Sequence, residues 1–270
     1  MNYNKPTARK NSIFLIPRHW RMLVRATLGD LKSRYAGSLL GIGWSILTPF
    51  VLLSIYSVIY LVVFKVRAPN LTPVKYVLLI FSGLVPFIMT NESINSAVNS
   101  IVANKAILAN TVFPVDLLPV KSVFSSQITM FVGMSAIVIT LIVTRDISWT
   151  VLLLPFIWLF HILAIVGLAW ILSLANLAVR DISNIITLGM VAVMVMTPIA
   201  YTREMVPAQL KLVMFINPLA YFVLAYQDIL VRSKVPDLGI IAFIIVFSAS
   251  LFLLGGWLFY RMKQVMLEYA

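Results

Sequence analysis

The fold of this chain is decided between residues 18 and 64, which read RHWRMLVRATLGDLKSRYAGSLLGIGWSILTPFVLLSIYSVIYLVVF. The first part, residues 18–35, is amphipathic and basic, as in a helix that lies in the membrane–water interface. Its apolar face comprises Trp20, Leu23, Val24, Leu28, Leu31 and Tyr35, and its other face carries Arg18, Arg21, Arg25 and Lys32. No charge lies between Arg34 and Lys65, and these 30 residues would reach about 45 Å as a helix, enough to cross a bilayer. The chain is therefore predicted to enter a membrane directly after a basic interface helix.

The composition agrees with a membrane protein. Hydrophobic residues make up 61% of the 270 residues, charged residues 11%, and the mean hydropathy is +0.99. Uncharged windows run over 35–64, 76–91, 122–144, 147–179, 182–202, 212–227 and 238–260. Most of them reach the roughly 20 residues that a spanning helix needs, and they are continuous apolar blocks rather than short alternating strands. The predicted fold class is an all-α polytopic membrane protein.

Six spanning helices are predicted, at about 38–64, 76–97, 121–143, 150–178, 184–201 and 238–260. Residues 202–236 contain only short apolar pieces between charged residues and prolines, so this segment is predicted to form re-entrant or interfacial helices. Eight of the 21 Lys and Arg precede Gly37, which places both termini in the cytoplasm for an even number of spans. The apolar run after Ser12 is too short for a signal peptide, so no cleavage is expected and residues 1–270 are predicted to form one membrane domain.

The residues that carry most enzyme chemistry are sparse. The net charge of +12 follows from the topology, so no nucleic acid partner is expected. The chain has no cysteine, and its two histidines, His19 and His161, are far apart without acids nearby, so neither a catalytic nor a metal site is predicted. No Gly-Lys dipeptide occurs, so the chain lacks a P-loop, and no cofactor is expected in it.

The second predicted span ends in polar residues. Asn91, Asn95 and Asn99 are spaced i, i+4, i+8, which predicts an amide stripe along one helix face. Glu92 is the only acid well inside an uncharged block. A structural, hydrated role for Glu92 is favoured over proton or ion coupling, and both interpretations stay open.

Aromatic side chains follow one face of the first predicted span. Tyr56, Tyr60 and Phe64 are spaced i, i+4, i+8, and Trp44 lies about three turns earlier. One interpretation is helix packing with an interfacial aromatic belt. The other is a track on which sugar rings stack.

Three ordered blocks of sequence resemble the membrane subunits of ABC-2-type polysaccharide exporters, the family that exports O-antigen, teichoic acid and capsular polysaccharide. The first block is DLKSRY at 30–35, GSLLG at 37–41 and WSILTP at 44–49. The second is SGLVPF at 82–87, SIVAN at 100–104, VFP at 112–114 and LLP at 117–119. The third is RDI at 180–182, TPIAY at 197–201 and INPL at 216–219 with Asp228. The resemblance extends in the correct order over about residues 20–265.

This resemblance implies a permease subunit that forms a homodimer and binds two copies of a separate ATPase subunit, which carries ATP and Mg. Lipid-linked polysaccharide would be exported across the bacterial inner (plasma) membrane, and membrane lipids would surround the chain. Residues 100–112 would form a coupling helix, and residues 202–225 would form re-entrant gate helices at the outer face. The implied sites are ATPase coupling by Arg21, Arg25, Asn104 and Lys105, an outer gate of Tyr201, Asn217, Pro218 and Tyr221, and a substrate path along Trp44, Tyr56, Tyr60 and Phe64.

Two alternatives remain. One is an ABC-2 exporter of another substrate, such as teichoic acid, capsule, a lipid or a drug. The other is a membrane-embedded glycosyl- or acyltransferase, which would need a cluster of acids or histidines at one membrane face. The scattered acids Asp116, Asp146, Asp181 and Asp228 do not form such a cluster in the sequence. The exporter permease is therefore the predicted function.

Overall fold

Four long helices form the centre of the molecule. The computed structural model describes residues 12–34, 36–59, 72–104, 113–201 and 211–269, and all regular structure in these ranges is helical. The long helices are α4 (Pro73–Val98), α7 (Leu117–Val143), α8 (Leu154–Ala178, which continues the 3-10 turn η3, Trp149–Leu153) and α12 (Leu238–Tyr269). Each is long and apolar enough to cross a membrane. The spans predicted at 76–97, 121–143, 150–178 and 238–260 are thereby confirmed as helices of spanning length.

The first and fifth predicted spans correspond to shorter helices. α3 (Trp44–Val58) and α9 (Ile182–Met196) have 15 residues each, about 22 Å of helix, which is less than the roughly 30 Å of a bilayer core. The predicted end of span one, residues 60–64, lies outside the described residues. The prediction of six spans therefore stays a prediction.

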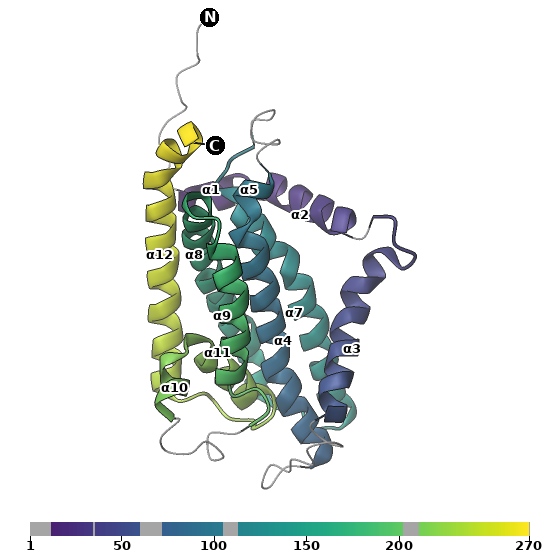
Figure 1. Ribbon diagram of the computed structural model, residues 1–270. Helices are drawn as coiled ribbons and strands as arrows, with labels where there is room; N and C mark the ends of the chain where they lie inside the picture. Colours follow the sequence, from purple (N-terminus) through teal and green to yellow (C-terminus); the bar gives the residue numbers. More distant parts are fainter. Residues whose placement is uncertain (1–11, 35, 60–71, 105–112, 202–210, 270) are drawn as a thin grey trace, which may run out of the picture.

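Three short helices lie across one end of the bundle, which is called the α2 end below. They are α1 (Ser12–Arg18), α2 (Trp20–Arg34) and α5 (Ser100–Ala103), and Figure 1 shows them at the end where α12 finishes. α2 lies on α7 because Leu23 and Leu31 of its apolar face are buried. After α2, Gly37 and Gly41 adopt positive φ angles of 79° and 51°, a conformation that favours glycine, and the turn η1 (Gly41–Gly43) leads into α3.

At the opposite end, α10 (Lys211–Ile216) and α11 (Pro218–Leu230) fill the space beside α8 and α12. α11 runs antiparallel to α8. The Phe222 ring stacks on His161 with centroids 4.3 Å apart, and the Thr150 hydroxyl at the start of η3 donates to the Ile229 carbonyl at 2.7 Å. α11 therefore begins inside the bundle and ends where α8 begins.

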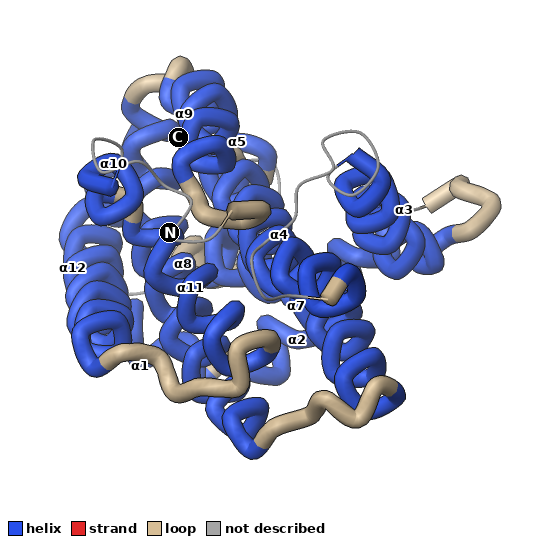
Figure 2. The backbone as a smooth tube through the Cα atoms, turned by 90° about the horizontal axis from the view of Figure 1, so that it is seen from below, coloured by secondary structure: helices blue, strands red, loops and turns tan. Residues whose placement is uncertain are grey.

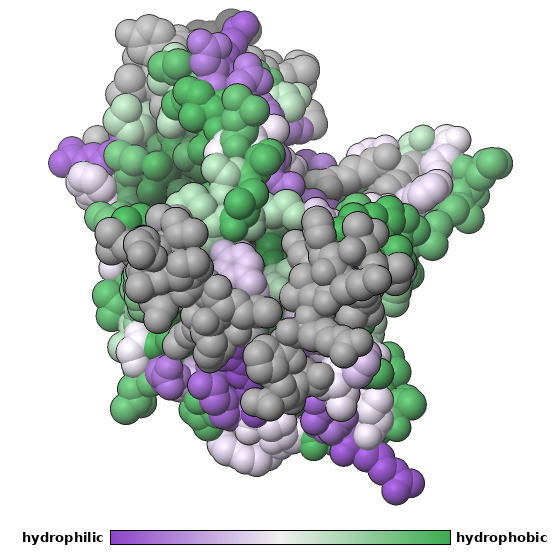
Figure 3. Space-filling model, turned by 60° about the horizontal axis from the view of Figure 1, so that its bottom comes forward, coloured by the Kyte–Doolittle hydropathy of each residue, from purple (hydrophilic) through white to green (hydrophobic). Residues whose placement is uncertain are grey.

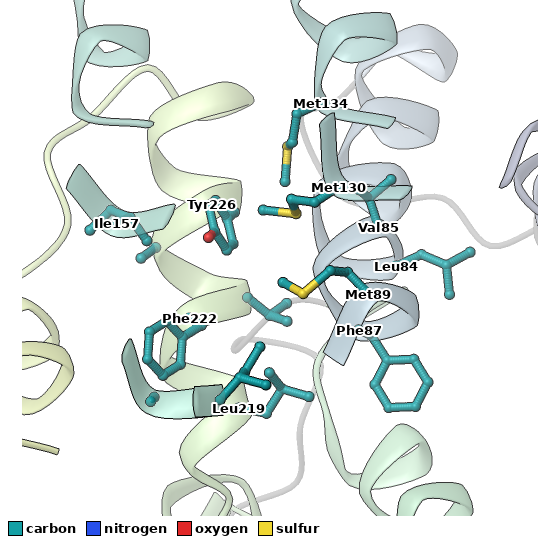
Figure 4. Packing of buried hydrophobic residues seen from close by; sticks show 14 of the residues in the cluster. Leu84, Val85, Phe87, Met89, Met130, Met134, Ile157, Leu219, Phe222 and Tyr226 are labelled. Carbon is teal, nitrogen blue, oxygen red and sulfur yellow. The ribbon is translucent and has the colours of Figure 1, made fainter. Parts of the chain in front are cut away.

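The core joins these helices through close apolar packing. Figure 4 shows the thioether ends of Met89 and Met130 directed toward Tyr226 of α11, and all three residues are fully buried. α8 and α12 approach so closely that a Cβ added at Gly167 would collide with the backbone of Leu251. Small residues that permit such backbone contact are the usual basis of helix association in membranes.

Candidate functional site

A face of α4 lies open between α3 and α9. Both ribbon views place α4 between these two helices, with α3 standing apart from α9 (Figures 1 and 2). The surface is notched between the arm that holds α3 and the side that holds α9 (Figure 3). The partly exposed polar residues of α4 in this region are Asn91, Glu92, Asn95 and Ser96. We call this region the α4 groove, with α4 as its floor and α3 and α9 as its walls.

The floor of the α4 groove is a chain of hydrogen-bonded amides. The Asn95 amide donates to the Asn91 side-chain carbonyl at 2.8 Å, and the Thr187 hydroxyl of α9 donates to Asn95 Oδ1 at 2.8 Å. Toward the α2 end, Asn176 of α8 donates to Asn99 Oδ1 at 3.2 Å. The predicted amide stripe is thus a continuous face that connects α4 to α8 and α9. Amide and hydroxyl groups on such a face can exchange these bonds for bonds to a polar substrate.

Glu92 lies beside this stripe and is tied to the scaffold. Its carboxylate accepts a hydrogen bond of 2.7 Å from the Thr129 hydroxyl of α7. The bond fits the structural role that the sequence favoured for Glu92, and ion coupling by this residue stays untested.

Tyr56 of α3 contributes to one wall. Trp44 is 39% exposed, and Tyr56 is half-buried with its hydroxyl 3.7 Å from the Met194 sulfur of α9. Tyr56 therefore closes the groove near the end of α9. Tyr60 and Phe64, the other predicted members of the substrate path, lie outside the described residues. The opposite helix, α9, carries exposed aliphatic side chains at Ile185, Leu188, Val191 and Val195.

Three of the four predicted outer-gate residues lie around the end of α9. Asn217 is buried, caps α11 by accepting from the Leu219 amide at 3.0 Å, and donates to the Thr197 hydroxyl at 2.7 Å. Pro218 is the first residue of α11, and the Tyr201 hydroxyl donates to the Val195 carbonyl at 3.3 Å.

The fourth of these residues, Tyr221, faces a different region. Its ring stacks on Phe243 at 3.8 Å, and its hydroxyl donates to the Phe215 carbonyl at 3.2 Å. There it borders a pocket of about 340 Å³ between α10, α11 and the start of α12.

The sequence profile of the ABC-2 type transporter family matches residues 23–231, from α2 to the end of α11. The chain belongs to this family. It is 31% identical over 215 residues to the O-antigen export system permease protein RfbA of Klebsiella pneumoniae, an alignment that covers 78% of this chain and 81% of that protein. It is also 25% identical over 240 residues to the protein of the same name from Myxococcus xanthus, with 85% and 90% coverage. As an ABC-2 permease, the chain is a multi-pass membrane component of a transporter, and the family implies an ATP-binding partner subunit.

In this ABC-2 permease, three of the four predicted coupling residues lie at one end of the bundle. Arg21 and Arg25 are exposed on α2, and Asn104 follows α5 with its amide bonded to the Ser100 carbonyl at 2.7 Å. Lys105 and the rest of the predicted coupling helix, residues 105–112, lie outside the described residues. Figure 1 shows α2 and α5 at the same end, so the structure brings these two segments to one surface.

α2 is fixed to the permease bundle by contacts that the sequence did not reveal. The Asp30 carboxylate lies 2.9 Å from the Lys121 ammonium of α7 and accepts from the Ser125 hydroxyl at 3.0 Å. The Trp20 ring meets Phe124 edge-on at 5.7 Å. The partners are more than 90 positions apart in the chain, so helical periodicity could not have paired them.

A second group missed from the sequence surrounds His161. Its imidazole lies 3.0 Å from the Thr90 hydroxyl and 3.3 Å from the Tyr226 hydroxyl, and the ring is buried. The contacts satisfy both ring nitrogens, as a histidine inside a membrane bundle requires. Within the described ranges no cluster of three His, Asp or Glu residues could hold a metal ion.

Proposed function

We propose that this chain is the permease subunit of an ATP-driven transporter that exports a lipid-linked, O-antigen-like polysaccharide across the bacterial inner membrane. The observation that carries this proposal is the α4 groove, in which an amide floor lies beside Tyr56 of α3. The permease named for O-antigen export in Klebsiella pneumoniae aligns with 78% of this chain.

The composition of the groove suits a glycan chain. Sugar hydroxyls need donors and acceptors inside a membrane, because an unpaired polar group there costs several kcal/mol. The Asn91–Asn95–Thr187 chain offers both kinds of group. Tyr56 adds an amphipathic ring that suits a half-wet surface. Several weak contacts of this kind let a long polymer move instead of holding it.

The proposed assembly is a homodimer with two ATPase subunits, which supply ATP and Mg. In it the α4 grooves of two permeases face one another, and Trp44, Tyr56, Tyr60 and Phe64 line the path. The six-span topology, with both termini cytoplasmic, places the α2 end in the cytoplasm. There Arg21, Arg25, Asn104 and Lys105 meet the ATPase, and residues 18–35 and 100–112 act as interface helix and coupling helix.

At the outer face we assign residues 202–225 to re-entrant gate helices, with Tyr201, Asn217, Pro218 and Tyr221 at the gate. The antiparallel course of α11 along α8 supports this assignment, because α11 starts at the depth of His161 and returns to the depth of Thr150. Its 13 residues, about 20 Å, are too few to cross the bilayer.

Variants of the groove test the function in cells that produce the glycan and the ATPase subunit. The double variants Tyr56→Leu with Tyr60→Leu, and Asn91→Ala with Asn95→Ala, should lower glycan export while expression and ATP hydrolysis persist. Each lost hydrogen bond is worth about 1 kcal/mol, which corresponds to about fivefold lower glycan export. Ser250→Ala is the matched control, because Ser250 is an exposed hydroxyl on α12, away from the groove. Normal export by both double variants would refute the path, and export of a drug or free lipid in place of glycan would refute the substrate class.

A further inference from the structure

The end of α8 carries a buried amide side chain, Asn176. This residue is 2% exposed and lies two positions before the last residue of α8, Ala178. The asparagine side chain has two N–H donors and one carbonyl acceptor, and burying such a group is costly unless it is hydrogen-bonded. Asn176 is bonded through both its nitrogen and its oxygen, and the two atoms hold different helices.

The nitrogen of the Asn176 amide holds the end of α4. It donates to the Val98 backbone carbonyl at 3.1 Å and to Asn99 Oδ1 at 3.2 Å. Val98 is the last residue of α4, so its carbonyl is one of the four that a helix leaves without a partner of its own. Asn176 therefore fixes the point at which the chain leaves α4 and continues into α5, where the predicted coupling helix begins.

The oxygen of the same amide holds the start of α9. The Ser183 backbone amide donates to Asn176 Oδ1 at 3.2 Å. Ser183 is the second residue of α9, so its N–H is one of the four that a helix leaves without a partner at its beginning. One turn further along α9, the Thr187 hydroxyl donates to Asn95 on the floor of the α4 groove. A single side chain thus caps two helices and connects them beside the groove.

The far side of the predicted coupling helix is also held by α8. Trp170 lies six residues, or about 9 Å, before Asn176 on α8, and its indole N–H donates to the Asp116 carbonyl at 2.9 Å. Asp116 directly precedes α7, and Trp170 is fully buried. The described residues before and after the predicted coupling helix are therefore both attached to the last part of α8. Asn176 is the attachment that continues to α9.

We propose that Asn176 is a positioning residue for energy coupling, which makes the end of α4, the end of α8 and the first turn of α9 move as one unit. This inference rests on the proposed function, in which an ATPase subunit acts on the coupling helix and the α4 groove is the glycan path. Movement imposed beside α5 then reaches Asn95 and Thr187 on the floor of the groove. Without Asn176, the three-residue link between α8 and α9, residues 179–181, absorbs this movement by bending.

Spin-label distances test whether this junction is one unit. The sequence contains no cysteine, so nitroxides are specific at Ala103→Cys on α5 and Ile185→Cys on α9, two exposed positions. Labelled chains are diluted with unlabelled chain in the complex with the ATPase subunit, with and without trapped ATP and Mg. The distance distribution of the parent should be narrow and equal in both states. Asn176→Leu removes all three hydrogen bonds with little change in volume and should broaden the distribution by several ångströms.

The coupling itself is measured as the amount of ATP hydrolysed per glycan exported. Asn176→Leu should raise this ratio about fivefold, the factor that corresponds to one lost hydrogen bond, because hydrolysis continues while less movement reaches the groove. Ser173→Ala is the matched control, since Ser173 is equally buried on α8 but donates within the helix, to the Trp170 carbonyl at 3.1 Å. This control should change neither the ratio nor the distances.

The outcomes separate coupling from folding. An unaltered distance distribution in Asn176→Leu would overturn the junction, and a ratio equal to that of Ser173→Ala would overturn its role in coupling. Asn176→Ala leaves space for water beside the freed groups and serves as the second variant where Asn176→Leu does not fold. Loss of assembly in both variants would assign Asn176 to folding alone and would also overturn the coupling role. A parent chain that exports no glycan would instead refute the proposed function, while the distances still decide whether Asn176 joins α5 to α9.

Discussion

Replacing Lys121 should weaken the attachment of α2 to the bundle. The size of the loss in stability depends on how deeply the Lys121–Asp30 ion pair is buried. The Lys121 ammonium and the Asp30 carboxylate are 2.9 Å apart, and their side chains are 13% and 21% exposed. Exposed ion pairs contribute about 0–1 kcal/mol, whereas removing one partner of a buried pair costs about 3–5 kcal/mol. A pair that is about four-fifths buried lies between these limits, so Lys121→Met should cost about 2 kcal/mol, or roughly 30-fold in the unfolding equilibrium.

A double-mutant cycle separates the pair from the individual side chains. Asp30→Asn keeps an oxygen that can accept from Ser125, so its cost reports mainly the lost charge. The double variant Asp30→Asn with Lys121→Met should cost at least about 1 kcal/mol less than the sum of the single variants, because contacting residues couple. The assay is unfolding of the detergent-solubilised chain by dodecyl sulfate, followed by tryptophan fluorescence. Trp20 beside Phe124 makes this signal sensitive to the α2–α7 contact.

The ion pair at the opposite end of the bundle is the matched control. Lys75 and Asp146 are 2.8 Å apart, but their side chains are 34% and 35% exposed. The hydrogen bond from Lys75 holds the pKa of Asp146 below its usual value, so this pair stabilises the fold at neutral pH and loses its effect as the pH falls below about 4. Lys75→Met should therefore cost less than Lys121→Met, and its effect should vanish in 1 M salt. Equal costs for the two variants, or additive costs in the cycle, would refute the reasoning from burial.

Two further predictions concern packing and topology. Gly167→Ala should destabilise the chain by about 3 kcal/mol, because the added Cβ would lie 2.6 Å from the Phe252 backbone nitrogen of α12. Gly189→Ala is the control and should cost nothing, because its added Cβ meets no atom within 4 Å. The same unfolding assay measures both, and a tolerated Gly167→Ala would disprove the close packing. Single cysteines at positions 70 and 146 should react with impermeant reagents from outside and one at position 105 only from the cytoplasm. Labelling of position 70 from the inside alone would rule out the six-span topology.

The parts of the fold that depend on local pattern could be predicted from the sequence. Uncharged windows located the four long helices, and the i, i+4, i+8 spacing of asparagines located the floor of the α4 groove. The partners of that floor could not be predicted, because Asn176 and Thr187 are 77 and 92 positions from the amides that they contact. Periodicity describes one helix face and carries no information about which distant face it meets.

The end of α9 shows a second limit. The uncharged window continues to residue 202, so hydropathy alone extends the helix to the end of the window. Pro198 stops it, because proline disfavours helical conformation in the residue before it, and Thr197 indeed caps α9 in an extended conformation. Tyr76 and Gln227 donate to the Ala200 and Pro198 carbonyls of the turn that follows, and these partners are visible only in the folded chain.

At the α2 end the helices of the permease form one connected unit. α2 is fixed to α7 by Asp30 and Lys121, and α7 packs along α4. The buried Asn176 of α8 then joins α4 to α9, because its amide donates to the Val98 carbonyl and its Oδ1 accepts from the Ser183 amide. A displacement of α2 by a partner subunit is therefore transmitted through α7 and α4 to the first turn of α9, beside the amide floor of the groove.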